Sequence, residues 1–216
     1  MKPANPSDPD AAADLAAATR RVIDRVRRSA ADPETMRRAA AGLEAIAREL
    51  EADAHPGPFM QRGLEWAGDL AAPEAPRDFA EFFPYSPLVG PRNPLAPPAR
   101  FEIRDGRIFG RVRYGAAYVG PPQSVHGGVI AATFDELLGS TNLVHQVGGM
   151  TGTLTVRYRA PTPILEEITL EGWLERVEGR KVFTRGEMRH AGRLTAEAEG
   201  VFIQGSVERL KATLAA

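Results

Sequence analysis

The chain has 216 residues, which is enough for one full domain with an extension. Its formal net charge is −1, so the charge gives no reason to expect a nucleic-acid-binding surface. The chain has no cysteine, which excludes disulfides, thiolate nucleophiles and cysteine-bound metals. Its four histidines are not spaced as metal ligands, so we expect no bound metal. No apolar run is long enough to span a bilayer and the amino terminus lacks the apolar core of a signal peptide, so a cytoplasmic protein without membrane contact is expected.

Residues 1–57 are predicted to form a helical extension. Asp8-Pro9 and Asp32-Pro33 each offer an N-cap followed by proline at the first helical position. Apolar residues recur at helical spacing after both starts, and His55-Pro56-Gly57 ends the second helix. The polar faces are rich in arginine, for which a solvated surface is expected and an anion-binding surface is the alternative. These arginines are Arg20, Arg21, Arg25, Arg27, Arg28, Arg37 and Arg38.

Residues 58–99 are predicted to form an extended arm that wraps over the following domain. Eight prolines fall between Pro73 and Pro98, and proline suits neither a helix interior nor the centre of a sheet. The same stretch carries several aromatic residues, which need to be covered. An ordered arm packed on the domain is therefore expected, with a disordered tether as the alternative.

Residues 100–216 are predicted to form a domain of the α+β class. Asp105-Gly106 is a strong hairpin signal, and the short turns between successive strands imply antiparallel pairing. Two strands, one long apolar helix and then four more strands predict a single helix buried against one curved antiparallel sheet. The predicted strands are Phe101 to Arg104, Arg107 to Tyr114, Met150 to Arg159, Ile168 to Val177, Lys181 to His190 and Leu194 to Gln204.

The segment from His126 to Ser140 carries the pattern that most clearly points to chemistry. A Gly127-Gly128 turn leads directly into a helix with an acid on its third turn. Glycine has no Cβ, so N–H groups in this turn can approach a ligand closely. They also begin a helix, where backbone donors lack partners and the dipole favours negative charge, as on an oxygen during acyl transfer. A plain turn before a solvated acidic pair is the alternative that the spacing leaves open.

Helical phase separates the two acids of this helix. Asp135 lies about 100° from Phe134, at the border of the apolar stripe, and its neighbours one turn away are mostly small. Glu136 points away from the stripe, so solvent or a subunit contact is expected for it. Asp135 is therefore the candidate catalytic acid. The apolar stripe expected to face the core comprises Ile130, Phe134, Leu137, Leu138 and Thr141.

Four motifs in order resemble the hotdog-fold acyl-CoA thioesterases, and most nearly the phenylacetate-pathway-like (PaaI-like) thioesterase family and its mitochondrial relatives. The resemblance covers residues 100–204. The motifs are Gly120-Pro121-Pro122 before His126-Gly127-Gly128, then Asp135, then Met150-Thr151-Gly152 leading into Tyr158-Arg159-Ala160-Pro161, and finally Gly192-Arg193-Leu194-Thr195-Ala196-Glu197-Ala198.

The resemblance implies a role for each matching residue. Asp135 would be the catalytic carboxylate, either as general base on water or as nucleophile on the thioester. The Gly127 N–H would hold the thioester oxygen, and His126 would brace the turn. Thr151 would hydrogen-bond the attacking water or the carboxylate. In the family the site forms between two subunits, so a homodimer is implied, and two dimers often associate.

Substrate contacts are expected along the helix and on one strand. The acyl chain would lie near Phe134, Leu138 and the dimer seam, while Gly128 and Gly139 would leave space for the thioester. Arg157 and Arg159 share a strand face and could meet coenzyme A phosphates, with a solvated face as the alternative. No cofactor is expected beyond coenzyme A as part of the substrate.

One position departs from part of the family. Some members carry Asn or Gln six residues before the histidine, where this chain has Gly120. The Gly-Pro-Pro subgroup also lacks that side chain, so activity is not excluded, although one polar partner is missing.

The leading hypothesis is hydrolysis of an acyl-CoA thioester to a free acid and coenzyme A. The alternative is a non-catalytic acyl-CoA-binding or regulatory hotdog dimer, motivated by the long amino-terminal helices and the proline-rich arm. A hydratase or dehydratase is disfavoured because no acid and histidine pair with the required spacing.

Overall fold

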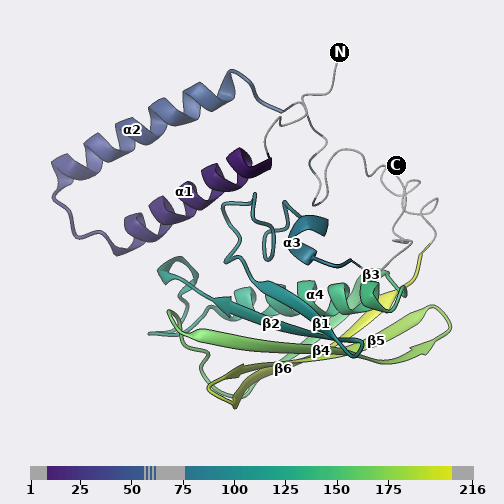
Figure 1. The fold of residues 1–216 in the computed structure, drawn as a ribbon. Helices are drawn as coiled ribbons and strands as arrows, with labels where there is room; N and C mark the ends of the chain where they lie inside the picture. Colours follow the sequence, from purple (N-terminus) through teal and green to yellow (C-terminus); the bar gives the residue numbers. More distant parts are fainter. Residues whose placement is uncertain (1–8, 56, 58, 60, 62–75, 206–216) are drawn as a thin grey trace.

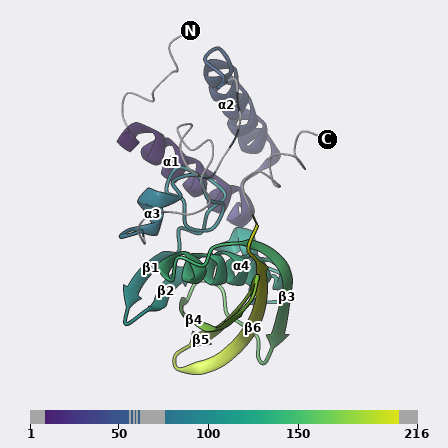
Figure 2. The ribbon, with the colours of Figure 1, turned by 90° about the vertical axis from the view of Figure 1, so that its right-hand side faces the viewer.

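Helix α4 (Gly127–Val144) lies on the inner face of a curved six-stranded antiparallel sheet that wraps around it (Figure 2). The computed structural model describes residues 9–55, 57, 59, 61 and 76–205. The arrangement is the predicted α+β hotdog fold. The strands are β1 (Arg100–Arg104), β2 (Arg107–Arg113), β3 (Met150–Tyr158), β4 (Glu167–Glu178), β5 (Lys181–His190) and β6 (Arg193–Ile203). The other helices are α1 (Pro9–Arg28), α2 (Pro33–Glu51), α3 (Phe79–Phe82) and the short 3₁₀ helix η1 (Ala116–Tyr118).

Each predicted strand is present, with its ends shifted by at most one residue. The strands lie in the order β1-β2-β4-β5-β6-β3, and neighbouring strands are antiparallel. Asp105 and Gly106, between β1 and β2, have positive φ values of 50° and 72°, as a two-residue hairpin turn requires. Strand β3 pairs with β6 and not with its neighbour in the chain. It therefore lies at an edge of the sheet, with one partner strand among the described residues.

Three glycines on neighbouring strands let α4 approach the sheet closely. A methyl group at Gly172 of β4 would lie 2.6 Å from Oγ1 of Thr141. One at Gly186 of β5 or at Gly200 of β6 would lie 3.1 or 3.0 Å from the δ carbons of Leu138. These positions leave no room for a side chain, so the helix packs directly on the strand backbones. The depth of α4 in the fold is set by this contact.

The apolar stripe predicted for α4 is confirmed, because all five of its residues are buried. The four apolar residues among them pack in one core cluster with residues of β2, β4, β5 and β6. Three polar residues of α4 that the stripe did not include are also buried: Thr133, Ser140 and Asn142. The hydroxyl of Thr133 lies 2.8 Å from the hydroxyl of the buried Tyr114. The helix is therefore covered on more than its sheet-facing side.

The second cover is the arm, whose described part runs from residue 76 to 99 and lies between α4 and the amino-terminal helices (Figure 1). Phe79, Leu88 and Val89 join the same core cluster as α4, which confirms an ordered arm for these residues. One turn of it, α3, is helical where an extended chain was predicted. The side chain of Asp78 caps this turn by accepting from the N–H of Ala80 (2.7 Å), and no proline interrupts it. Residues 62–75 of the predicted arm lie outside the described residues.

Helices α1 and α2 form where the proline-marked starts predicted them. The side chain of Asp32 caps α2 by accepting from the N–H groups of Glu34 and Thr35, while the other predicted cap, Asp8, lies outside the described residues. The expectation of a solvated arginine face is wrong for Arg20, whose guanidinium donates to the carbonyls of Pro91 and Asn93 (3.2 and 2.8 Å). This bond fastens α1 to the arm.

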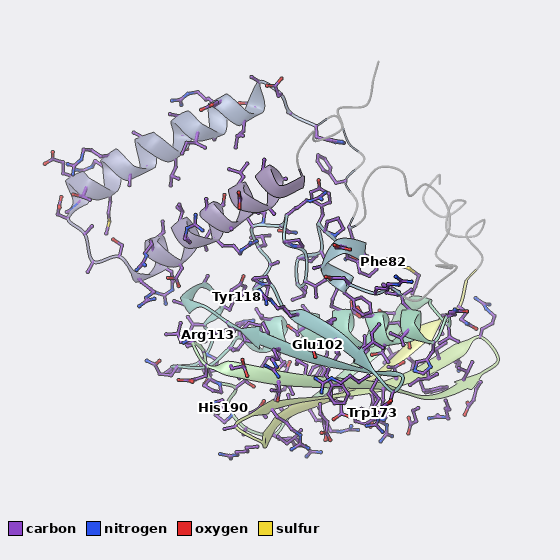
Figure 3. The ribbon with its side chains drawn as sticks, viewed as in Figure 1. Phe82, Glu102, Arg113, Tyr118, Trp173 and His190 are labelled. Atoms are coloured by element: carbon purple, nitrogen blue, oxygen red, sulfur yellow. The ribbon has the colours of Figure 1, made fainter. Side chains whose placement is uncertain are left out.

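A second fastening holds the arm to η1. Tyr118, labelled below α1 in Figure 3, donates from its hydroxyl to the carbonyl of Leu95 (2.7 Å). The arm is thereby bonded to η1, which precedes the glycine turn in the chain. None of the helices in the described part of the chain combines the length and the hydropathy needed to cross a membrane.

We predict that Gly172→Ala lowers the free energy of unfolding by about 1–3 kcal/mol, because overpacking forces α4 away from the sheet. Gly42→Ala in α2 is the matched control, since nothing lies within 4 Å of a methyl group there, and alanine raises helix stability by about 0.5–1 kcal/mol. Urea unfolding of both variants measures the difference. Equal stability of the two variants would contradict the close-packing account.

Candidate active site

The glycine turn before α4 leaves one backbone donor free. The ring Nδ1 of His126 accepts from the N–H of Gly128 (3.0 Å) and caps the helix. The carbonyl of His126 accepts from the N–H groups of Val129 and Ile130 (2.9 and 3.2 Å). Among the described residues, the N–H of Gly127 donates to no acceptor. It stands at the first position of the helix, where the dipole places partial positive charge.

The histidine therefore holds the turn, as the bracing role requires. Its Nδ1 lone pair is engaged by Gly128, so that nitrogen is not available as a base. The backbone N–H of His126 donates to the carbonyl of Tyr118 (2.8 Å). Gly120 packs against the same residue, since a methyl group at 120 would lie 2.7 Å from Cα of His126. This backbone has no room for the Asn or Gln that some relatives carry at that position.

The candidate acid is exposed and held by one side chain. The hydroxyl of Thr151 donates to Oδ1 of Asp135 (2.7 Å), and both side chains are exposed. The structure thus brings together two of the residues predicted for the site. A carboxylate with a fixed orientation and one oxygen open to solvent can accept a proton from water or attack a carbonyl carbon.

A β-bulge at Gly152 makes the Thr151 contact possible. Strict alternation would place Thr151 with Thr153 and Thr155 on the outer face of β3. The register shifts between Thr151 and Thr153, so that Thr151 lies opposite Phe202, a core residue of the inner face. One extra residue in a strand reverses the side on which the preceding side chain points. The bulge therefore turns Thr151 toward α4.

The free donor and the acid do not meet within one chain. Gly127 and Asp135 are eight residues apart on one straight helix, which separates them by about 12 Å along its axis. A thioester carbon and its oxygen are bonded atoms, so one thioester cannot contact both groups of a single protomer. Each chain therefore presents the donor and the acid at different points along α4.

The expectation for Glu136 is wrong, because its carboxyl is covered by the arm. Its Oε1 is buried and has no hydrogen-bond partner among the described residues. Burial raises the pKa of Glu136 to about 7, and the neighbouring charge of Asp135 adds to the rise. A hydrogen bond with the hydroxyl of Ser86, a buried arm residue, opposes it. Helical phase placed Glu136 away from the sheet correctly, but it could not show that the arm covers that side.

The residues expected to contact substrate lie in different surroundings. Phe134 and Leu138 have no exposed surface, so the structure presents them as core residues and contact with an acyl chain stays a prediction. Gly139 is half-buried, and the N–H of Gly128 is already engaged by His126. A role for these two glycines beside the thioester also stays a prediction.

The two arginines of β3 each have a carboxylate partner on β6. Arg157 pairs with Glu199 (2.9 Å) and Arg159 with Glu197. These are exposed cross-strand pairs, which contribute little to stability. The outer face of the sheet is thus balanced in charge at these positions, and recognition of coenzyme A phosphates by the two arginines stays a prediction.

Sequence reasoning missed Tyr158 as a residue of the site. Its hydroxyl donates to the carbonyl of Gly127 (2.9 Å), and its ring occupies the space next to that glycine, since a methyl group at 127 would lie 3.4 Å from Cζ. The available signal was its place on the helix-facing side of β3, in alternation with Leu154 and Val156. A hydroxyl at the end of an otherwise apolar face needs a polar partner.

Comparisons with known proteins agree with this geometry. The family model described as Thioesterase superfamily matches residues 123–197, a stretch that contains the glycine turn, Asp135 and Thr151. A solved crystal structure described as a thioesterase superfamily protein is 36% identical, with a TM-score of 0.75, over 89% of this chain and 94% of that one. The chain belongs to the thioesterase superfamily.

Two curated relatives, both named as thioesterases, match a smaller part of this chain. The acyl-coenzyme A thioesterase THEM4 of Xenopus laevis is 40% identical over 88 residues, which are 39% of this chain and 39% of the relative. The THEM4 protein of Mus musculus is 33% identical over 92 residues, 42% of this chain and 40% of the relative. The match thus spans about two fifths of either relative. Membership of the thioesterase superfamily gives the exposed acid and the free backbone donor a chemical context.

We predict that Glu136→Gln removes a pH dependence of stability between pH 4.5 and about 7. A carboxyl whose pKa is raised by folding binds more protons in the folded than in the unfolded protein within this window, so the wild type loses stability as the pH rises. Relative to the wild type, the variant should gain up to about 3 kcal/mol between pH 4.5 and pH 8. Urea unfolding at both pH values measures this gain.

The matched control for that experiment is Glu44→Gln, at an exposed position of α2. Its stability relative to the wild type should be the same at both pH values. If Glu136→Gln behaved like Glu44→Gln, burial of the Glu136 carboxyl beneath the arm would be refuted.

Proposed function

We propose that this protein hydrolyses acyl-coenzyme A thioesters to a free acid and coenzyme A. The observation that carries the proposal is an exposed carboxylate, Asp135, held by Thr151 and lying on the same helix as the unengaged N–H of Gly127. Water attacks the thioester carbon, the carbon–sulfur bond breaks, and the thiol leaves with a proton. This acyl transfer needs two groups: a carboxylate that acts as base or nucleophile, and a donor that hydrogen-bonds the oxyanion.

Gly127 supplies the oxyanion donor. As the thioester carbon becomes tetrahedral, its oxygen gains negative charge and accepts from the Gly127 N–H. The two bonds that the preceding carbonyl accepts, from Val129 and Ile130, polarise that peptide and strengthen its N–H as a donor. The helix dipole adds partial positive charge at the same point. Removing such a donor from other acyl-transfer enzymes costs about 10²–10³ in kcat.

Asp135 supplies the carboxylate. As general base it removes a proton from the attacking water; as nucleophile it attacks the thioester carbon and water then hydrolyses the anhydride. Both routes need one carboxylate oxygen directed at the substrate. Thr151 donates to Oδ1 and so leaves Oδ2 for that purpose.

The active enzyme in this proposal is a homodimer. Gly127 and Asp135 of one chain are about 12 Å apart along the helix, so Gly127 of one protomer serves Asp135 of the other. The sheet has two edges, β1 and β3, and the dimer proposed here uses β3, whose nine residues are all exposed or half-buried and which pairs only with β6 among the described residues. A second copy adding its own β3 to this edge covers it and places two α4 helices side by side.

The curated relatives support the choice of substrate class. Both are named acyl-coenzyme A thioesterases, and their match to this chain includes about two fifths of their length. The substrate class is carried over to this chain as part of the proposal, and the acyl group is left open.

We predict that Asp135→Asn lowers the rate of thiol release from acyl-CoA by about 10²–10⁴. Asparagine keeps the size of the side chain and still accepts from Thr151, so the dimer should persist. Thiol release is measured over a panel of acyl chain lengths, with the exposed Asp105→Asn in the β1–β2 turn as control. If Asp135→Asn released thiol at the wild-type rate, the catalytic role assigned to Asp135 would be wrong. Tight acyl-CoA binding by the wild type without thiol release would favour the non-catalytic alternative.

We predict that two inactive variants restore activity when mixed. Gly127→Pro removes the free N–H at the first helical position, where proline is tolerated, and the φ of −61° and ψ of 134° at His126 suit the residue before proline. Gly127→Ala keeps the N–H and is the matched control for the added carbon. Unfolded together and refolded, Gly127→Pro and Asp135→Asn should recover roughly a quarter of wild-type activity, because half of the dimers carry one complete site.

The mixing experiment also tests where the site lies. If both groups served one thioester within a single protomer, no mixture would exceed the activity of its components. Each variant measured alone gives that baseline, and size-exclusion chromatography confirms that the mixed sample is dimeric.

A further inference from the structure

The peptide between Gly127 and Gly128 is held at both of its polar atoms. His126 accepts its N–H through Nδ1 (3.0 Å), and the hydroxyl of Tyr158 donates to its carbonyl (2.9 Å). One bond is made by the residue that precedes the turn, and the other by a residue at the end of β3. Together they fix the plane of this peptide.

This restraint is one of several at the turn, because the carbonyl of His126 also accepts from Val129 and Ile130. Glycine populates many backbone conformations, and the first residues of a helix have no preceding turn to bond with. Two glycines in succession at a helix start would therefore sample several orientations. The Gly127 N–H lies in the His126–Gly127 peptide, and Tyr158 restrains Gly127 at the following peptide, through its carbonyl.

The ring of Tyr158 adds a steric restraint to the hydrogen bond. A methyl group on Gly127 would lie 3.3 Å from the Tyr158 oxygen and 3.4 Å from its Cζ. The phenol thus occupies the space in which a side chain at position 127 would lie.

Strand β3 also holds the acid of the same chain. Thr151, near its start, donates to Asp135 (2.7 Å), and Tyr158, at its end, donates to Gly127. One strand therefore contacts α4 at both functional positions. The inner-face residues between them, Leu154 and Val156, are partly buried against the core.

We propose that Tyr158 is a positioning residue, which orients the Gly127 N–H toward the thioester oxygen through its bond to the Gly127 carbonyl. This inference rests on the proposed function, because it assigns the Gly127 N–H as oxyanion donor. Tyr158 itself does not touch the reacting atoms. Its contribution is to the transition state, in which the oxygen carries charge, more than to the binding of the thioester.

The test is Tyr158→Phe, which removes the hydroxyl and keeps the ring. We expect kcat for acyl-CoA hydrolysis to fall about tenfold, while the Kd of a non-hydrolysable thioether analogue of acyl-CoA changes less than about twofold. Tyr118→Phe is the matched control, since it removes a phenol-to-carbonyl bond of similar length to Leu95 (2.7 Å). It should leave kcat unchanged.

A double variant separates positioning from a general structural role. If Tyr158 acts through the Gly127 N–H, the loss from Tyr158→Phe should disappear in a Gly127→Pro background, because the group that it orients is absent. A loss that multiplies with that of Gly127→Pro would overturn the inference. So would wild-type kcat in Tyr158→Phe.

Hydrogen exchange gives a readout that does not depend on turnover. The Gly128 amide, bonded to His126, should exchange faster in Tyr158→Phe than in the wild type, and at the wild-type rate in Tyr118→Phe. If the wild type released no thiol from any acyl-CoA, the proposed function would fail. Unchanged exchange at Gly128 would then overturn the restraint by Tyr158 independently.

Discussion

The direct packing of α4 on the backbones of three strands is the contact on which the rest of the fold depends. Gly172, Gly186 and Gly200 have no side chains to hold the helix away, so its apolar residues fill the whole space inside the curved sheet. This depth fixes where the two ends of the helix emerge. The positions of the glycine turn at its start and of the acid on its third turn follow from this packing.

A helix held in this way can present only a limited set of side chains to a ligand. The sheet covers the face that carries Phe134 and Leu138, and the arm covers the side that carries Glu136. Asp135 is the acid that stays exposed. The arm thus distinguishes two adjacent carboxyls: that of Glu136 is buried, with a pKa of about 7, and that of Asp135 is open to solvent.

The rise of the helix explains why the proposed enzyme takes the donor from one subunit and the acid from the other. A rise of about 1.5 Å per residue separates the donor from the acid by far more than the size of a thioester. Two antiparallel copies of α4 across a symmetric interface bring each donor to the acid of the other. Strand β3, which holds Thr151 against the acid and Tyr158 against the turn, is also one of the two edge strands of the sheet. The residues that orient both groups therefore lie beside the proposed interface.

The amino-terminal helices add a layer on the far side of the arm (Figure 1). Arg20 bonds to the arm and Tyr118 of η1 does the same from below. These contacts connect the extension to the segment that leads into the glycine turn. Helix α2 has no buried residue, so its contribution to the framework is small compared with that of α1.

The sequence by itself determined the elements and the candidate acid. Alternating apolar residues predicted every strand with its ends correct to one residue. Asp105-Gly106 predicted a turn, and helical phase selected Asp135 as the candidate acid. These signals are local, because capping, turn geometry and side-chain periodicity act over a few residues. Tertiary structure alone decided that β3 pairs with β6, that the bulge at Gly152 turns Thr151 inward, and that Tyr158 bonds to Gly127. Each depends on residues that are far apart in the chain, and no local pattern records which distant groups will meet.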